Sequence, residues 1–168
     1  MIGRAEIYIK WALYGLVTAA LLALQGMLQE VRILGVLPYL YPVLAAVLAM
    51  YEGPFPGAVY GLVLGLVCDA TIPGPIPCLH VLVFPLVGLG AGLIARHWLP
   101  AGFPCSLVVS AAAFLLTDAF RCLLLVFTGG MGGAAVSVAL RETVVSLLFT
   151  PVVLLAFRAV FRKCRLED

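Results

Sequence analysis

Long apolar segments recur along almost the whole sequence, separated only by short polar breaks. Hydrophobic residues make up 64% of the 168-residue chain and charged residues only 11%, which is unlike the composition of a soluble globular domain. A helix needs about 20 mostly apolar residues to cross a bilayer. The segments fall at residues 11–28, 36–51, 55–70, 78–95, 105–127 and 140–160. We therefore predict an all-α integral membrane protein with six transmembrane helices, in which residues 1–168 form a single transmembrane domain.

Basic residues are distributed unevenly around these segments. Six helices place both termini on one side of the membrane, and cytoplasmic loops carry an excess of lysine and arginine. With both termini in the cytoplasm, seven basic residues fall on the inner side: Arg4, Lys10, Arg96, Arg158, Arg162, Lys163 and Arg165. Only Arg32, Arg121 and Arg141 fall on the outer side or at the adjoining helix ends. This asymmetry predicts a multi-pass protein of the cytoplasmic membrane with both termini in the cytoplasm.

The segment 55–70 contains glycines at four-residue intervals. We call Gly57, Gly61 and Gly65 the glycine ridge, because this spacing places them on one face of a helix. In water each glycine would cost a helix about 1 kcal/mol relative to alanine. In a bilayer, small residues allow two helix backbones to approach closely. We expect the glycine ridge to be a helix-packing or partner surface, and we expect the rest of the chain to pack around this segment.

The first segment contains a second row of small residues with the same spacing. Gly15, Ala19 and Ala23, which we call the first-segment ridge, also share one face of a helix. This pattern predicts a second surface for packing against a helix or a partner.

Charged residues in the outer halves of the segments form a candidate site, which we call the polar cluster. It comprises Asp69, Asp118, Arg121, Arg141 and Glu142. Asp69 continues the four-residue step of the glycine ridge, and Asp118 and Arg121 are three residues apart on one helix, close enough to pair. Charges inside a membrane span are candidates for a functional site. A structural ion pair that fixes one helix to its neighbours explains Asp118 and Arg121 equally well.

The sequence contains no recognisable pattern of catalytic or metal-binding residues. None of the five cysteines forms a Cys-x-x-Cys pair or lies at metal-ligand spacing from a histidine. Cys68 and Cys78 flank one short loop, and the sequence leaves open whether they pair. We expect His80 to be a hydrogen-bonded loop residue rather than a ligand. We also find no nucleophile–base or phosphate-loop motif, so we predict a non-enzymatic protein without a cofactor. The net charge of +2 gives no signal for nucleic-acid binding.

Several short motifs make the chain resemble the MreD family of bacterial rod-shape-determining membrane proteins. These motifs are Gly35-Val36-Leu37-Pro38-Tyr39-Leu40, then Glu52-Gly53-Pro54, then the glycine ridge followed by Leu66 and Asp69. Pro151 in the last segment and the short basic tail also agree with the family. Family members often carry an acidic residue after the proline of the second segment, where this chain has Tyr39.

The resemblance implies a non-enzymatic scaffold of the cell-elongation machinery, acting in cell shape and peptidoglycan synthesis. Its implied partners are the membrane protein MreC and other membrane proteins of that machinery, and a homodimer is an open alternative. The family is also similar in fold to the substrate-binding subunits of energy-coupling-factor vitamin transporters. In that alternative, the first-segment ridge would dock a coupling subunit and the polar cluster would bind a vitamin. The outer half has few aromatic residues to enclose a flat ligand, which favours the scaffold.

Overall fold

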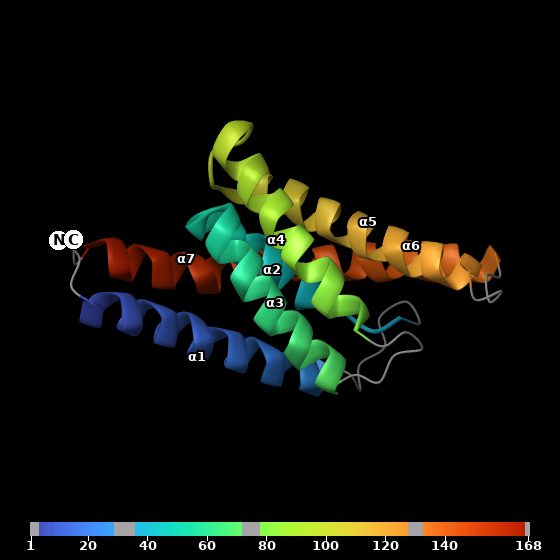
Figure 1. Cartoon of the computed structure of the whole chain (residues 1–168), viewed down its shortest axis with the longest axis horizontal. Coiled ribbons are helices and arrows are strands. Elements are labelled where there is room, and N and C mark those ends of the chain that lie inside the picture. The colour runs from blue at the N-terminus through green and yellow to red at the C-terminus, as the bar shows by residue number, and fades with distance from the viewer. Residues whose placement is uncertain (1–3, 29–35, 72–77, 128–132, 167–168) are drawn as a thin grey trace.

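The computed structural model describes residues 4–28, 36–71, 78–127 and 133–166, and within these ranges every regular element is an α-helix (Figure 1). The helices are α1 (Arg4–Leu28), α2 (Tyr41–Glu52), α3 (Pro54–Thr71), α4 (Leu79–His97), α5 (Phe103–Phe127), α6 (Gly133–Leu147) and α7 (Thr150–Leu166). The predicted segments 11–28, 55–70, 78–95 and 105–127 correspond to α1, α3, α4 and α5. The predicted segment 36–51 is a shorter helix, and 140–160 is divided between α6 and α7.

The described residues contain four helices that are long and apolar enough to cross a membrane, located in α1, α3, α4 and α5. The number rises to five if α6 and α7, which meet at a bend of 45°, form one span. This is the character of a multi-pass membrane protein. The prediction of six spans is not reproduced, because α2 has only 12 residues and rises about 18 Å, well short of the hydrocarbon core.

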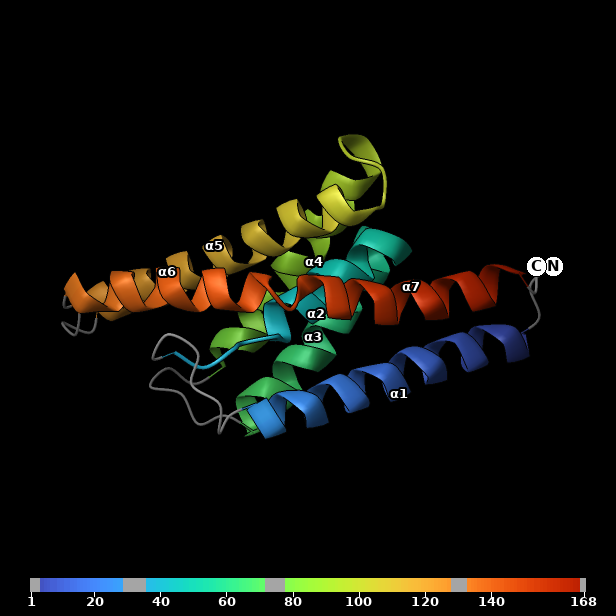
Figure 2. The same ribbon diagram turned by 180° about the vertical axis from the view of Figure 1, so that it is seen from behind.

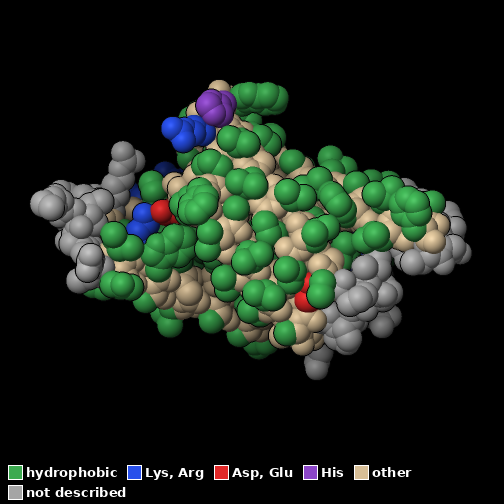
Figure 3. Space-filling view, in the orientation of Figure 1, with side chains coloured by type: hydrophobic (Ala, Val, Ile, Leu, Met, Phe, Trp, Pro, Cys, Tyr) green, Lys and Arg blue, Asp and Glu red, His purple; other side chains and the backbone are tan. Residues whose placement is uncertain are grey.

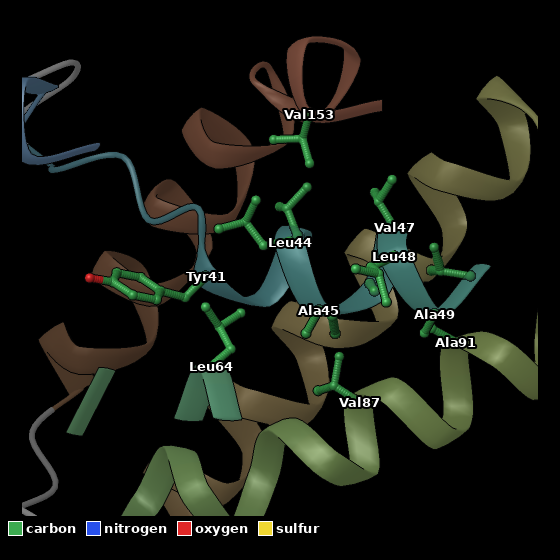
Figure 4. Close-up of a cluster of buried hydrophobic side chains, with 14 of the residues drawn as sticks. Tyr41, Leu44, Ala45, Val47, Leu48, Ala49, Leu64, Val87, Ala91 and Val153 are labelled. Atoms are coloured by element: carbon green, nitrogen blue, oxygen red, sulfur yellow. The ribbon is translucent and has the colours of Figure 1, made fainter. Parts of the chain in front are cut away.

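The shortest helix, α2, occupies the centre of the molecule. All ten residues from Tyr41 to Met50 are buried, on every face of the helix. Figure 4 shows its side chains directed toward neighbouring helices, including Leu44 near Val153 of α7 and Ala45 near Val87 of α4. A helix that is apolar all round must be enclosed by others. The expectation that the chain packs around segment 55–70 is therefore wrong, because α2 is the most enclosed element.

The chain enters α2 through a short non-helical stretch, residues 37–40. Irregular backbone is tolerated at membrane depth only when its polar groups find partners inside the protein. The amide of Tyr39 donates to Ser146 Oγ of α6 at 2.9 Å, and the amide of Leu40 donates to Gln25 Oε1 of α1 at 3.0 Å. Side chains from two distant helices therefore satisfy the backbone where α2 begins.

The break between α6 and α7 follows from Pro151. Proline lacks the amide that would bond to the carbonyl four residues earlier, and its ring crowds that carbonyl. Around the break the backbone uses tighter bonds, from Leu148 N to Val145 O at 3.3 Å and from Phe149 N to Ser146 O at 3.1 Å. Ser146 is the residue that bonds Tyr39, so the two interruptions of helical structure contact each other.

The first turn of α1 and the last turns of α7 lie at the same end of the molecule in both ribbon views (Figures 1 and 2). Helices α1 and α7 also contact each other. Hydrophobic side chains cover most of the face drawn in Figure 3, and charged side chains are few there.

Candidate functional site

The glycine ridge lies against α4, where it brings the backbones of the two helices into direct contact. A Cβ atom added to Gly61 would overlap the backbone of Phe84, and one added to Gly65 would overlap the backbone of His80. A Cβ atom on Gly57 would overlap Ala49 of α2 and lie 3.1 Å from the carbonyl oxygen of Gly88. The glycine ridge is therefore occupied within the chain, and it leaves no open surface for a partner helix.

The α4 side of this contact also depends on glycine. A Cβ atom on Gly88 would overlap the backbone of Gly57, and one on Gly92 would overlap Pro54. We call this contact the α3–α4 seam. The sequence shows Gly88, Gly90 and Gly92 close together, but it does not show which of them face α3. Gly90 has nothing within 4 Å of a would-be Cβ atom.

The first-segment ridge has the opposite environment. Gly15, Ala19 and Ala23 are all exposed, and nothing lies within 4 Å of a Cβ atom added to Gly15. Gly15 and Ala19 line a groove of about 400 Å³ between α1 and α3. We call it the α1–α3 groove; Val63 of α3 is among the residues on its opposite wall.

Polar side chains along one face of α1 attach this helix to the body of the protein. Lys10 Nζ lies 2.6 Å from Glu52 Oε2, and the Tyr14 hydroxyl donates to Glu52 Oε1 at 2.7 Å. Farther along, the Thr18 and Tyr60 hydroxyls are 2.7 Å apart. With Gln25 bonding the entry to α2, these contacts form what we call the α1 latch: Lys10, Tyr14, Thr18 and Gln25 on α1, with Glu52, Tyr60 and the Leu40 amide as partners.

Sequence reasoning did not identify the α1 latch. The available signal was the spacing of Lys10, Tyr14 and Thr18 at four-residue steps within an otherwise apolar helix. Polar residues with this spacing share one face and would be costly if they faced lipid. Their partners are 15 to 42 residues away along the chain, so the sequence gives no indication of where they bond.

Asp69 caps α4 from the last turn of α3. Its Oδ1 atom lies 2.6 Å from His80 Nδ1 and accepts the His80 amide at 3.3 Å, while Oδ2 accepts the Val81 amide at 3.0 Å. A carboxylate at a helix N-terminus satisfies free amides and interacts favourably with the helix dipole. Both oxygens of Asp69 are therefore used to join α3 and α4. His80 is buried and hydrogen-bonded but belongs to α4 rather than a loop, and its Nε2 has no partner in the described structure.

Tyr39 lies beside this pair. Its hydroxyl is 3.4 Å from Cys68 Sγ, and its ring centroid is 6.1 Å from that of His80. All five cysteines, including Cys68 and Cys78, are free thiols. Tyr39 occupies the position at which members of the resembled family often have an acid, and here it packs rather than carries charge.

Three of the four remaining members of the polar cluster connect α5 with α6: Asp118, Arg121 and Glu142. Arg121 Nη1 lies 3.4 Å from Glu142 Oε2, and Thr143 donates to Asp118 Oδ2 at 3.2 Å. The predicted pairing of Arg121 with Asp118 on one helix is replaced by contacts between two helices. Arg141 is exposed and takes part in neither contact.

Except for Arg141, the polar cluster thus divides into two sets of interhelical contacts, one joining α3 to α4 and the other joining α5 to α6. Histidine, cysteine, aspartate and glutamate form no group of three or more suited to a metal ion within the described ranges. The arrangement is suited to holding helices together. Comparison with family models, curated protein sequences and solved structures gave no match to this chain.

Proposed function

We propose that this protein is a non-enzymatic membrane scaffold of the bacterial cell-elongation machinery and binds MreC in the cytoplasmic membrane. The proposal rests on the resemblance of its motifs to the MreD family. One structural observation supports it: four of the five charged residues of the polar cluster bond to other helices of the same chain. Asp69 uses both oxygens on α4, and Arg121, Glu142 and Asp118 bond across α5 and α6.

This observation favours the scaffold over the transporter alternative. A site for a small polar ligand needs a few oriented polar groups that are free to contact it. Here all of those groups except Arg141 bond other helices, while the outer helix faces carry large exposed apolar side chains such as Leu16, Leu115 and Leu155. Apolar faces in a bilayer are surfaces for lipid or for other transmembrane helices. In our proposal both termini lie in the cytoplasm, in agreement with the basic residues of α7.

Depletion of the protein from a rod-shaped bacterial host tests the proposal. A scaffold of cell elongation gives rounded cells, and affinity-tagged full-length chain recovers MreC from detergent-solubilised membranes. Loss of uptake of a single nutrient, rescued by supplying it in excess, would contradict the proposal. Purified protein that retains a stoichiometric vitamin would also contradict it.

A further inference from the structure

The exposed face of α7 changes from apolar to basic along the helix. Val152 and Leu155 are exposed near its start, and Arg158, Arg162 and Lys163 are exposed toward its end. At 3.6 residues per turn, these five positions lie within an arc of about 140°. They therefore form one continuous strip along α7. We call its second half, Arg158, Arg162 and Lys163, the basic face of α7.

The opposite side of α7 fixes the direction of the basic face. Val153, Phe157 and Val160 are buried against the rest of the protein. Near the end of the helix, the ring of Phe161 stacks on the ring of Tyr51 in α2, with the ring centroids 4.9 Å apart. A helix that is packed along one side cannot rotate about its axis without losing these contacts. The basic face is therefore held in a fixed orientation, directed away from the protein.

The basic face has no carboxylate partner among the described residues. Two other cationic side chains do have one: Lys10 Nζ lies 2.6 Å from Glu52 Oε2, and Arg121 Nη1 lies 3.4 Å from Glu142 Oε2. None of the ion pairs in the described part of the chain includes a residue of the basic face. The last two residues of the sequence are acidic and lie outside the described ranges. The basic face is thus open to an anionic group.

The neighbouring residues place the basic face at the level of the lipid headgroups. Leu155, 63% exposed, is the last large exposed apolar residue of α7, and such a side chain faces lipid chains in a bilayer. Arg158 lies about 4.5 Å and Arg162 about 10.5 Å beyond it along the helix. The headgroup layer is about 5–7 Å thick, and arginine side chains reach back along apolar surface toward it. Tyr8 and Trp11 of α1, which are exposed at the same end of the molecule, are residue types typical of this layer.

From this arrangement we propose that the basic face of α7 binds the headgroup of an anionic phospholipid. A guanidinium group donates two parallel hydrogen bonds to a phosphate, and basic residues at the membrane surface attract anionic lipids. A single phospholipid matches both halves of the strip, because its acyl chains cover Val152 and Leu155 while its phosphate contacts Arg158 and Arg162. An acidic segment of a soluble protein would match only the basic half. This inference requires α7 to lie in a bilayer, and it does not depend on the proposed scaffold function.

Native mass spectrometry of the full chain tests this assignment. The protein is released from nanodiscs that contain equal amounts of phosphatidylglycerol and phosphatidylethanolamine with the same acyl chains. We expect wild-type protein to retain more phosphatidylglycerol than phosphatidylethanolamine. Arg162→Gln should lower this enrichment about fivefold, which is the effect of one basic residue at an anionic surface. Arg158→Gln is a second variant at an exposed position and should act in the same direction.

Arg141→Gln is the matched control, because it removes the same charge from an exposed position on α6. It should leave the enrichment unchanged. Equal enrichment in Arg162→Gln and Arg141→Gln would overturn the assignment. A photo-crosslinking amino acid at position 159, exposed between the two arginines, gives an independent readout in native membranes. Adducts with phospholipid support the assignment, and adducts with a protein in place of lipid would identify a protein-binding surface and overturn it.

Discussion

The α3–α4 seam and the contact of α1 with the rest of the protein show two different ways of holding an apolar helix against its neighbours. Both use an apolar helix with small residues every four positions. In the seam, the glycines bring two backbones into direct contact, so Gly61 lies against the carbonyl of Phe84. Helix α1 keeps its small residues exposed and is attached through the α1 latch instead. Identical spacing therefore does not predict identical packing.

The reason lies in what faces the small residues. Every glycine of the ridge meets backbone on α4: Gly57 lies opposite Gly88, Gly61 lies against Phe84 and Gly65 lies against His80. The residues of α3 that line the groove all have larger side chains, and these separate the two backbones: Val59, Tyr60, Val63, Leu64 and Val67. Where backbones cannot meet, side-chain hydrogen bonds are the remaining way to fix a helix in a bilayer. The two regions should therefore respond differently to substitution. We expect the largest loss of stability in the α3–α4 seam and the smallest at one hydroxyl of the α1 latch.

The largest effect is expected in the seam. Gly61→Ala places a Cβ atom against the backbone of Phe84, which cannot move without shifting α4. We expect a loss of about 2–3 kcal/mol or more in the free energy of unfolding, at the upper end of overpacking. Gly90→Ala is the control on α4, because its Cβ atom meets nothing, and it should stabilise the helix by up to about 1 kcal/mol. Both changes in stability are measured by unfolding the variants in mixed micelles with an increasing fraction of a denaturing detergent. Equal changes in the free energy of unfolding for the two variants would show that backbone contact does not determine the stability of the seam.

The next largest effect is expected at the entry to α2. Gln25→Leu keeps the size of a buried side chain but leaves the Leu40 amide without its acceptor. An unsatisfied buried amide costs about 1–3 kcal/mol. Gln25→Glu retains an acceptor oxygen for the Leu40 amide, but it also adds the cost of a buried carboxyl group, so it should be destabilised for a different reason. The same detergent unfolding assay gives both values. A Gln25→Leu variant as stable as wild type would show that another group, or water, satisfies this amide.

A smaller effect is expected between α5 and α6. The Arg121 and Glu142 side chains are 34% and 20% exposed, so their ion pair is partly screened. A double-mutant cycle with Arg121→Gln and Glu142→Gln should give a coupling energy of about 0.5–1 kcal/mol. The parallel cycle with Arg121→Gln and Asp118→Asn should give a smaller coupling, because Asp118 bonds Thr143. A larger coupling energy in the second cycle would show that Arg121 pairs with Asp118 on the same helix, as the sequence predicts.

Much of this architecture could be predicted from local patterns. The apolar segments located α1, α3, α4 and α5 closely, because composition and length determine a membrane helix without reference to its neighbours. Two features escaped prediction for the same reason. The apolar stretch 36–51 looks like a span, yet its first residues are non-helical because Ser146 and Gln25 supply partners from far along the chain. The sequence shows Pro151, but it does not show that the segment is divided there into two separate helices, α6 and α7.

The polar cluster was predicted as a set but not in its pairings. Asp69, Asp118, Arg121 and Glu142 all lie in contacts between helices, and Arg141 does not. Spacing along one helix suggested Asp118 with Arg121, because only intrahelical neighbours can be read from a single sequence. Which carboxylate meets the guanidinium depends on how α5 and α6 are rotated, and that is set by packing. The glycine ridge and first-segment ridge were likewise indistinguishable until their partners were known.

The smallest effect is expected from one hydroxyl of the α1 latch. Thr18→Val keeps the shape of the side chain and removes its contact with the Tyr60 hydroxyl. Interhelical hydrogen bonds in membranes contribute about 0.6 kcal/mol on average, since the separated helices find other partners. Thr117→Val is the matched control, because the Thr117 hydroxyl is also buried and donates to the Ala113 carbonyl of its own helix. The difference between the two variants in detergent unfolding therefore isolates the contact between α1 and α3. If Thr117→Val is as destabilising as Thr18→Val, this contact contributes nothing measurable. The hydrogen bonds and ion pair that attach α1 would then be those of Glu52 and Gln25, at the two ends of the groove.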